Sequence, residues 1–144
     1  MQYWDTSTLA KLYVSEPDLA QFAAYLAATG PVTTSELARW EFFRVLARKE
    51  AEGVLPIGAA EAIFTRFLAD IAVGKVVLVP MGSPVETIFQ QLVLRLHRLK
   101  PPLVVRTLDG IHIATADFHG SDALVATDTH MRKCAAAIGL RLYP

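Results

Sequence analysis

The segment Gln2-Tyr3-Trp4-Asp5-Thr6-Ser7 gives the clearest indication of the fold. In it a short apolar run ends at an aspartate, and a segment of helical periodicity follows directly. Val125-Ala126-Thr127-Asp128 repeats this arrangement near the other end of the chain. Because ligand-binding side chains of a parallel α/β sheet gather at the carboxyl ends of its strands, we expect Asp5 and Asp128 to lie at one edge of such a sheet.

The remaining sequence alternates short apolar runs with helical periodicity, and proline or glycine marks several boundaries. We predict strands over residues 2–5, 31–33, 75–80, 123–127 and 141–143. We predict helices over residues 6–14, 18–28, 34–52, 58–72, 84–99, 107–119 and 129–138. Strands that alternate with helices favour an α/β fold, here a three-layer α/β/α sandwich around a central, mainly parallel sheet of four to five strands.

Composition limits the possible classes of protein. A chain of 144 residues is expected to form a single domain, and its 14 basic and 14 acidic residues give a net charge of zero. The apolar share of 53% is above the usual value of about 45–50%, which suggests apolar surface reserved for a partner. The lone Cys134 excludes an internal disulfide. No signal peptide or membrane span is expected, and a reducing cytoplasm is the default compartment.

Four acidic residues are candidates for one functional site: Asp5, Glu41, Asp109 and Asp128. Carboxylates gathered at a sheet edge repel one another unless a hard cation such as Mg²⁺ lies between them. Each acid also has a structural alternative. Asp5 and Asp128 could cap the helices that follow them, and Asp109 could interact with the dipole of its own helix.

Glu41 competes with Glu36 for the fourth place in this cluster. Thr33 and Glu36 match a capping box at the start of the predicted long helix, which gives Glu36 a structural task. Glu41 lies five residues further on, about 140° round the helix, so the two side chains should not face one site. Because Glu41 is flanked by apolar residues and needs a partner there, we choose Glu41.

The chain resembles the PIN-domain family, and within it the VapC-type toxin ribonucleases of toxin–antitoxin pairs. Four segments carry the resemblance: Asp5-Thr6-Ser7 with the residues up to Tyr13, Glu41 with Leu46-Ala47-Arg48, the run from Arg106 to Ala116, and the run from Asp122 to Asp128. They span essentially the whole chain, which is therefore expected to be one PIN domain over residues 1–144. The one departure is Gly110, where the family often has a small apolar residue.

The resemblance implies a PIN-like fold and an Mg²⁺-dependent, or Mn²⁺-dependent, endoribonuclease. In such enzymes the acids matching Asp5, Glu41, Asp109 and Asp128 hold the metal, which activates water for attack on an RNA phosphodiester. Beside them, the hydroxyls of Thr6, Ser7 and Thr127 could orient water or a carboxylate, or only cap helices. Arg106 is the preferred RNA contact within the acid-free stretch that also carries Arg95, Arg98 and Lys100. His112, one helical turn from Asp109, is a further candidate.

The resemblance also implies a homodimer and a small VapB-like antitoxin bound in an apolar groove. The candidate groove residues lie in the first helices: Leu9, Leu12, Tyr13, Leu19, Phe22 and Leu26. Burial in the core is the alternative for them, but we expect at least one of Phe22 and Tyr25 to be exposed. Trp4 and Trp40 are expected to fill the core or an interface.

Two other functions remain open from the sequence. The first is an aspartyl-phosphate phosphohydrolase of the haloacid-dehalogenase type, although its phosphatases have a second aspartate two residues after the first, where this chain has Ser7. The second is a PIN-like module that binds RNA or protein without catalysis.

Overall fold

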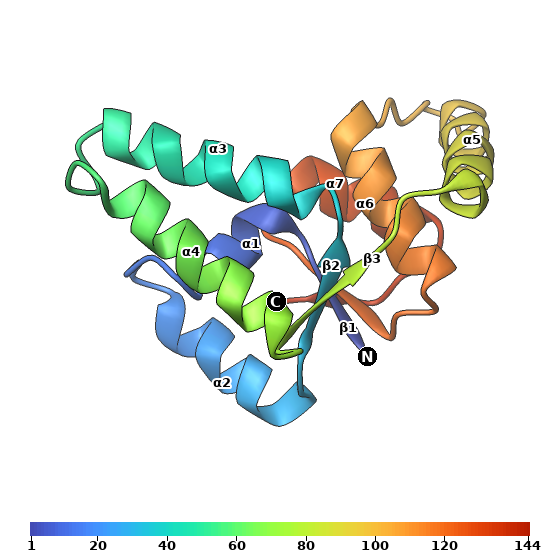
Figure 1. Cartoon of the computed structure of the whole chain (residues 1–144). Helices are drawn as coiled ribbons and strands as arrows, with labels where there is room; N and C mark the ends of the chain where they lie inside the picture. The colour runs from blue at the N-terminus through green and yellow to red at the C-terminus, as the bar shows by residue number, and fades with distance from the viewer.

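A five-stranded sheet forms the centre of the molecule in a computed structural model that describes residues 1–144 (Figure 1). The strands are β1 (Gln2–Trp4), β2 (Val32–Ser35), β3 (Val76–Val79), β4 (Ala123–Val125) and β5 (Leu142–Tyr143). Their order across the sheet is β3-β2-β1-β4-β5, and every neighbouring pair is parallel. The predicted sheet is therefore confirmed, at the upper end of the expected strand number.

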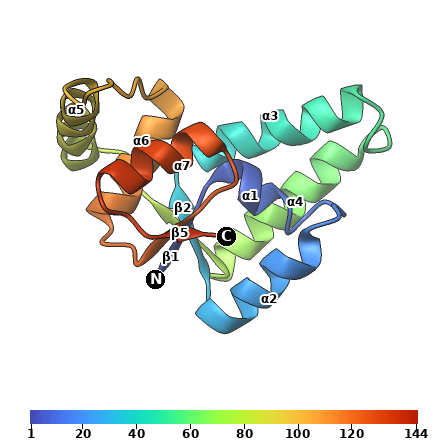
Figure 2. The same cartoon turned by 180° about the vertical axis from the view of Figure 1, so that it is seen from behind.

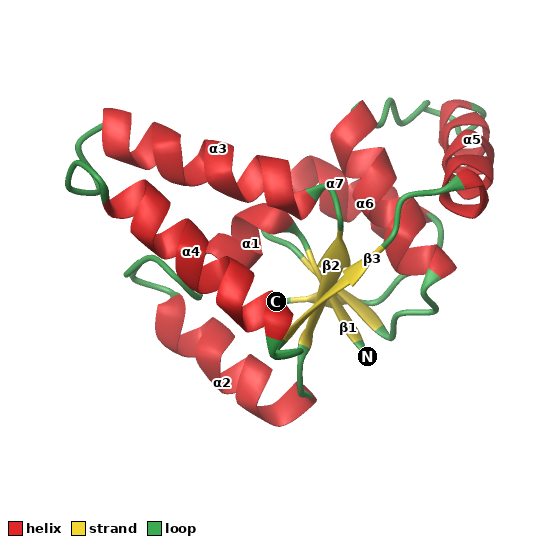
Figure 3. Cartoon of the chain, in the orientation of Figure 1, coloured by secondary structure: helices red, strands yellow, loops and turns green.

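Seven helices cover both faces of this sheet (Figure 3). They are α1 (Thr6–Ala10), α2 (Leu19–Thr29), α3 (Ala38–Ala51), α4 (Ala59–Ala72), α5 (Ser83–His97), α6 (Thr107–Phe118) and α7 (Thr129–Ala137). Figure 2, which shows the molecule from behind, places α5, α6 and α7 on one side of the sheet and α1 to α4 on the other. The fold is the three-layer α/β/α sandwich that the sequence predicts.

Alternation along the strands divides the apolar core in two. Successive side chains of a strand point to opposite faces, and Tyr3 and Trp4 are both fully buried but belong to different core clusters. Trp4 packs with the side chains of α1 to α4, whereas Tyr3 packs with those of α5 to α7. Leu124 and Val125 on β4 divide in the same way. Both faces of the sheet are therefore covered by helices, with one core cluster on each face.

The strand order places a switch point beside β1. The chain leaves β1 for β2 and β3 on one side and later returns to β4 on the other. Trp4 pairs with Val125 at the carboxyl ends of β1 and β4, and the Asp5 amide donates a hydrogen bond of 3.0 Å to the Val125 carbonyl. Open α/β sheets bind their ligands in the crevice at such a point. The fold thus brings the segments containing Asp5 and Asp128 to the same edge.

The predicted helix over residues 34–52 starts too early. β2 runs through Ser35, and α3 begins only at Ala38. Thr33 and Thr34 are fully buried and pair with Val77 and Leu78 of β3, so strand pairing, which suits β-branched residues, supersedes the local helix-start signal. The Ser35 hydroxyl accepts the Leu37 amide in the turn between strand and helix.

The predicted capping box is consequently wrong. Thr33 lies inside β2, and the carboxylate of Glu36 accepts a hydrogen bond of 3.2 Å from the Met81 amide instead of reaching back to a helix start. The first predicted helix is also too long. α1 ends at Ala10, and turns with hydrogen bonds to the third preceding residue carry the chain through Tyr13. The other predicted elements agree with the structure within about two residues.

The apolar residues of the first helices belong to the core rather than to an open groove. Leu9 and Phe22 are buried, and Leu12, Tyr13 and Leu26 are partly buried against the same cluster. The expectation that at least one of Phe22 and Tyr25 is exposed is wrong, because Phe22 is buried and Tyr25 is partly buried against this cluster.

Tyr25 is only partly buried: its ring stacks on Tyr143, and its hydroxyl donates to Gln2. Trp4 fills the core as expected, but Trp40 is 64% exposed and has no place in it. No helix has the length and apolar character needed to cross a membrane.

Candidate active site

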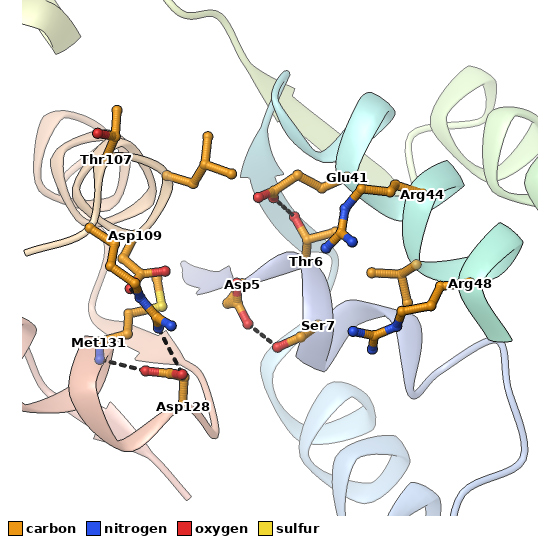
Figure 4. Close-up of a pocket in the computed structure, with 13 residues that line it drawn as sticks. Asp5, Thr6, Ser7, Glu41, Arg44, Arg48, Thr107, Asp109, Asp128 and Met131 are labelled. Atoms are coloured by element: carbon orange, nitrogen blue, oxygen red, sulfur yellow. Dashed lines mark hydrogen bonds and ion pairs between the residues drawn. The ribbon is translucent and has the colours of Figure 1, made fainter. Parts of the chain in front are cut away.

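The pocket at the switch point has a volume of about 420 Å³ and is lined by all four candidate acids, Asp5, Glu41, Asp109 and Asp128 (Figure 4). Asp5 follows β1, Glu41 lies in the first turn of α3, Asp109 lies in the first turn of α6, and Asp128 precedes α7. Residues from four separate elements therefore face one cavity.

Asp5 lies on the floor of the pocket and is only 8% exposed. The Ser7 hydroxyl donates a short hydrogen bond to its Oδ2 (Figure 4), and its carboxylate makes no capping bond to α1. Burial raises the pKa of Asp5 above the ordinary aspartate value, although the nearby His112 and the Ser7 bond favour the charged form. Asp5 therefore does not cap α1, and no basic side chain forms an ion pair with its carboxylate.

Glu41 is held by a network of hydrogen bonds that extends from the pocket into the core. Its Oε2 accepts hydrogen bonds from the Thr6 hydroxyl at 2.6 Å and from His112 Nε2 at 2.7 Å. The opposite ring nitrogen of His112 lies 2.7 Å from the Tyr3 hydroxyl. Because a carboxylate can only accept, His112 Nε2 carries a proton in this arrangement and, in neutral His112, Nδ1 accepts from Tyr3.

The same network sets the charges of Glu41 and His112. Burial would raise the pKa of Glu41, but hydrogen bonds from His112 and Thr6 hold it below its usual value. Burial likewise disfavours a charged His112, whereas the bond to Glu41 and the field of Asp5 raise its pKa overall. His112 is 1% exposed and does not line the pocket. It contacts the site from behind, through Glu41.

Asp109 and Asp128 share one cation, Arg106. Arg106 Nε donates to Asp109 Oδ2 at 2.6 Å, and a terminal guanidinium nitrogen lies 2.8 Å from Asp128 Oδ2. Asp128 also accepts the Met131 amide at 2.7 Å, so it caps α7 as well as lining the pocket. That backbone bond and Arg106 together lower the pKa of Asp128 despite partial burial. Arg106 is therefore committed to these acids in this structure.

Asp109 and Asp128 thus share Arg106, whereas Asp5 and Glu41 each have their own hydrogen-bond partners. No three of the acidic, histidine and cysteine side chains converge closely enough to hold a single ion. The donor chemistry still fits Mg²⁺ or Mn²⁺, because carboxylates and the Thr6 and Ser7 hydroxyls offer only hard oxygen atoms, which these ions prefer. Such ions also keep several water ligands, so a few carboxylates spread over an open pocket suffice.

Two basic residues of the pocket are not among the predicted contacts. Arg44 and Arg48 project from α3 on the side opposite Asp109 and Asp128 (Figure 4). Of the basic stretch that the sequence favours for RNA contact, only Arg106 lines the pocket, whereas Arg95 bonds to the Ala137 carbonyl. The spacing of Arg44 from Glu41, three residues on one helix, is the signal that could have identified it.

The remaining candidates divide between the pocket and its surroundings. Thr6 and Ser7 line the cavity, and each hydroxyl bonds an acid. Thr127 is exposed and does not line the pocket.

Comparison with known proteins agrees with this fold. The family model described as PIN domain matches residues 3–137. Ribonuclease VapC46 of Mycobacterium tuberculosis is 32% identical to this chain over 140 residues, which cover 96% of this chain and 92% of the relative. The chain therefore belongs to the PIN-domain family.

Solved structures show the same fold. FitAcB from Neisseria gonorrhoeae matches with a TM-score of 0.74 at 18% identity, covering 100% of this chain and 97% of its own. VapBC2 from Rickettsia felis, bound to a DNA fragment from their promoter, matches with a TM-score of 0.70 at 14% identity, covering 99% and 98%. At these identities the likeness concerns the fold.

Proposed function

We propose that the protein is a VapC-type endoribonuclease that hydrolyses an RNA phosphodiester with the help of Mg²⁺ or Mn²⁺. The observation that carries this proposal is the meeting of Asp5, Glu41, Asp109 and Asp128 in one pocket at the switch point of the sheet. The similarity to ribonuclease VapC46 over nearly the whole chain supports the same activity.

The four acids are the residues that would hold the cation. When bound, such an ion supplies a water of lowered pKa and neutralises charge that develops on the phosphate oxygens. The chain itself fixes its carboxylates: Ser7 orients Asp5, and Thr6 with His112 orients Glu41. Carboxylates whose positions are fixed in advance need little reorganisation during the reaction.

Arg44 and Arg48 have a different task, which is to attract the polyanionic substrate. Without them the pocket would carry four acids against the single Arg106, which is already bound to Asp109 and Asp128, and would repel a phosphodiester. Their guanidinium groups can bind phosphate oxygens without regard to base sequence. The acids would then carry the chemistry, while the arginines bring the backbone to it.

A cleavage assay tests the catalytic proposal. Purified protein should cut labelled RNA in Mg²⁺ or Mn²⁺ and lose this activity in excess EDTA. Asp5→Asn should be inactive under both conditions. A protein equally active in EDTA would overturn the metal-dependent mechanism, and a folded protein that binds RNA without cutting it would be a non-catalytic module.

We further propose that the protein is the toxin of a VapBC-type pair, acts as a single PIN domain and forms a homodimer. The similarity to VapBC2 supports an antitoxin partner, and exposed apolar side chains on α3 and α4 offer surface for protein contacts. Expression in a bacterial host should arrest growth. Asp109→Asn should remove the arrest, and so should co-expression of a cognate antitoxin. Growth unaffected by the wild-type protein would contradict the toxin role.

A further inference from the structure

Three exposed side chains form a row on α3 beside the acid pocket: Trp40, Arg44 and Arg48. They are spaced four residues apart, so they lie on one ridge of the helix, about 6 Å from one to the next along its axis. Arg44 and Arg48 line the pocket (Figure 4). Trp40 immediately precedes Glu41 in the sequence, and its indole is 64% exposed.

The two arginines of this row form few ion pairs within the protein. Arg44 forms no ion pair, and Arg48 has only a loose contact of 3.7 Å with Glu52, where both side chains are more than half exposed. Arg106, on the opposite wall, is bound by two carboxylates at 2.6 and 2.8 Å. Exposed ion pairs such as that of Arg48 contribute little stability. Arg44 and Arg48 are therefore the guanidinium groups of the pocket that can bind an external anion.

Trp40 also has no structural task. The other tryptophan, Trp4, is fully buried and packs against Phe22, whereas Trp40 takes part in no aromatic pair and in neither core cluster. A large aromatic face left in water beside two exposed guanidinium groups matches what a single strand of nucleic acid requires. Bases stack on the aromatic ring, and the backbone follows the positive charges.

We infer that Trp40, Arg44 and Arg48 bind an unpaired strand of RNA as it enters the pocket. The guanidinium groups contact phosphates, and the indole stacks on a base next to the cleavage site. This inference rests on the proposed ribonuclease function and deepens it, because it names the residues of this chain that hold an unpaired strand beside the pocket. A base inside a duplex is already stacked on its neighbours and cannot offer its face to Trp40.

Binding of a labelled RNA in EDTA tests this inference without cleavage. The probe is a fluorescent single strand of about 12 nucleotides, within the range of known site sizes, compared with the same sequence as a duplex. The variants are Trp40→Ala, Trp40→Phe, Arg44→Ala and Arg48→Ala. Matched controls are Ile57→Ala, which removes an apolar side chain that is 97% exposed on the α3–α4 loop, and Arg98→Ala at the end of α5.

The inference predicts tighter binding of the single strand than of the duplex. Trp40→Ala should weaken binding about 10-fold or more, as expected when a base can no longer stack on an aromatic ring, and Trp40→Phe should keep most of the affinity. Each arginine variant should weaken binding and reduce the slope of log affinity against log salt by about 0.7 for each phosphate that the arginine bound. RNA should quench the tryptophan emission of the wild type, and Trp40→Phe should abolish this quenching because Trp4 is buried. Both control variants should behave as wild type.

Three outcomes would overturn the inference. Variants that bind the single strand as tightly as wild type would exclude the row as an RNA site. The same conclusion would follow if Trp40→Ala changed the oligomeric mass and left RNA affinity intact, because Trp40 would then belong to a contact between protein chains. In either case wild-type cleavage would leave the ribonuclease proposal standing. A wild-type protein that neither binds nor cuts RNA would overturn both.

Discussion

Asp5 and Glu41 lie in the same pocket, but the protein stabilises their charges very differently. Glu41 receives hydrogen bonds from Thr6 and His112, which keep its pKa low despite burial. Asp5 is more deeply buried, and burial raises its pKa. A buried carboxylate of this kind costs stability when it is ionised without a partner, which is the condition that a bound cation would relieve.

Replacing Asp5 should therefore stabilise the metal-free protein at neutral pH. A carboxyl whose folded pKa lies above its unfolded value makes the protein less stable as the pH rises from the unfolded pKa to the folded pKa, because the unfolded chain loses its proton first. We expect Asp5→Asn to raise the free energy of unfolding in EDTA at pH 7 by on the order of 1 kcal/mol. The gain should vanish below about pH 4, near the unfolded pKa, where both chains are neutral at this position. Urea unfolding across this pH range measures it, and a destabilised variant at pH 7 would contradict the account.

The buried network behind Glu41 gives a second prediction. Tyr3→Phe removes the hydroxyl bonded to His112 Nδ1 at 2.7 Å and leaves that nitrogen buried without a partner. Such a loss costs about 1–3 kcal/mol. Tyr25→Phe is the matched control, because its hydroxyl bonds Gln2 in a partly exposed setting, and it should cost less than about 1 kcal/mol. Chemical denaturation that gives equal losses for both variants would show that the His112 network is not as drawn.

Some residues of the site could be predicted from the sequence, and others could not. Asp5 and Asp128 could be placed in the site because a strand end followed by a helix start is visible in the sequence. The contact of His112 with Glu41 joins residues 71 positions apart and depends on how α6 packs against the sheet, where it contacts β2 and β4. Its spacing from Asp109 indicated only that it was near. Of the two places predicted for Trp40, its exposure rules out the core, because an apolar residue type does not reveal which side of a helix faces the core.

Among the elements, α6 depends on a close contact that its glycine allows. A Cβ on Gly110 would come within 2.7 Å of Cε2 of Phe89 on α5, and α6 nevertheless runs without a break from Thr107 to Phe118. Gly110 thus leaves room for the Phe89 ring. The cost of a glycine in a helix, about 1 kcal/mol, is offset by the closer approach of the two helices.

This contact predicts opposite effects of one substitution in two backgrounds. Gly110→Ala should destabilise the wild-type protein by about 1 kcal/mol, because overpacking of about 1–3 kcal/mol exceeds the gain in helix propensity. In a Phe89→Leu background, which removes the obstructing ring, the same change should be neutral or stabilising. Thermal unfolding of the four proteins in the cycle measures the coupling. Independent effects of the two substitutions would contradict the contact.

The elements themselves were predictable where local pattern and tertiary pairing agree. The second strand is the exception, because Thr33 and Thr34 resemble a helix start but are buried in pairing with β3. A capping box supplies about 1 kcal/mol, less than burial and a ladder of hydrogen bonds together. Local chemistry therefore could not reveal which state these residues adopt.

At the scale of the whole molecule, the alternating pattern was enough to predict the layered fold and its parallel sheet. The partner surface was not predictable in the same way. The residues chosen for a groove on the first helices are mostly taken up by the core. Large exposed apolar side chains lie in several other places, and one group of them is on α3, α4 and their connecting loop: Trp40, Phe43, Val54, Ile57 and Leu68. Composition shows an excess of apolar residues, but only the packing shows which of these side chains stay exposed.

The central claim is that the acid pocket cuts RNA with a divalent cation, and a matched pair of glutamate variants tests it most directly. Glu41 lines the pocket, whereas Glu36, five residues earlier, accepts the Met81 amide outside it. The measurement is the rate of RNA cleavage in Mg²⁺ by wild type, Glu41→Gln and Glu36→Gln. We predict that Glu41→Gln loses at least about 100-fold in rate, since it removes a carboxylate that would hold the cation, and that Glu36→Gln retains the wild-type rate. Full activity of a folded Glu41→Gln protein, or loss of activity only in Glu36→Gln, would contradict the account.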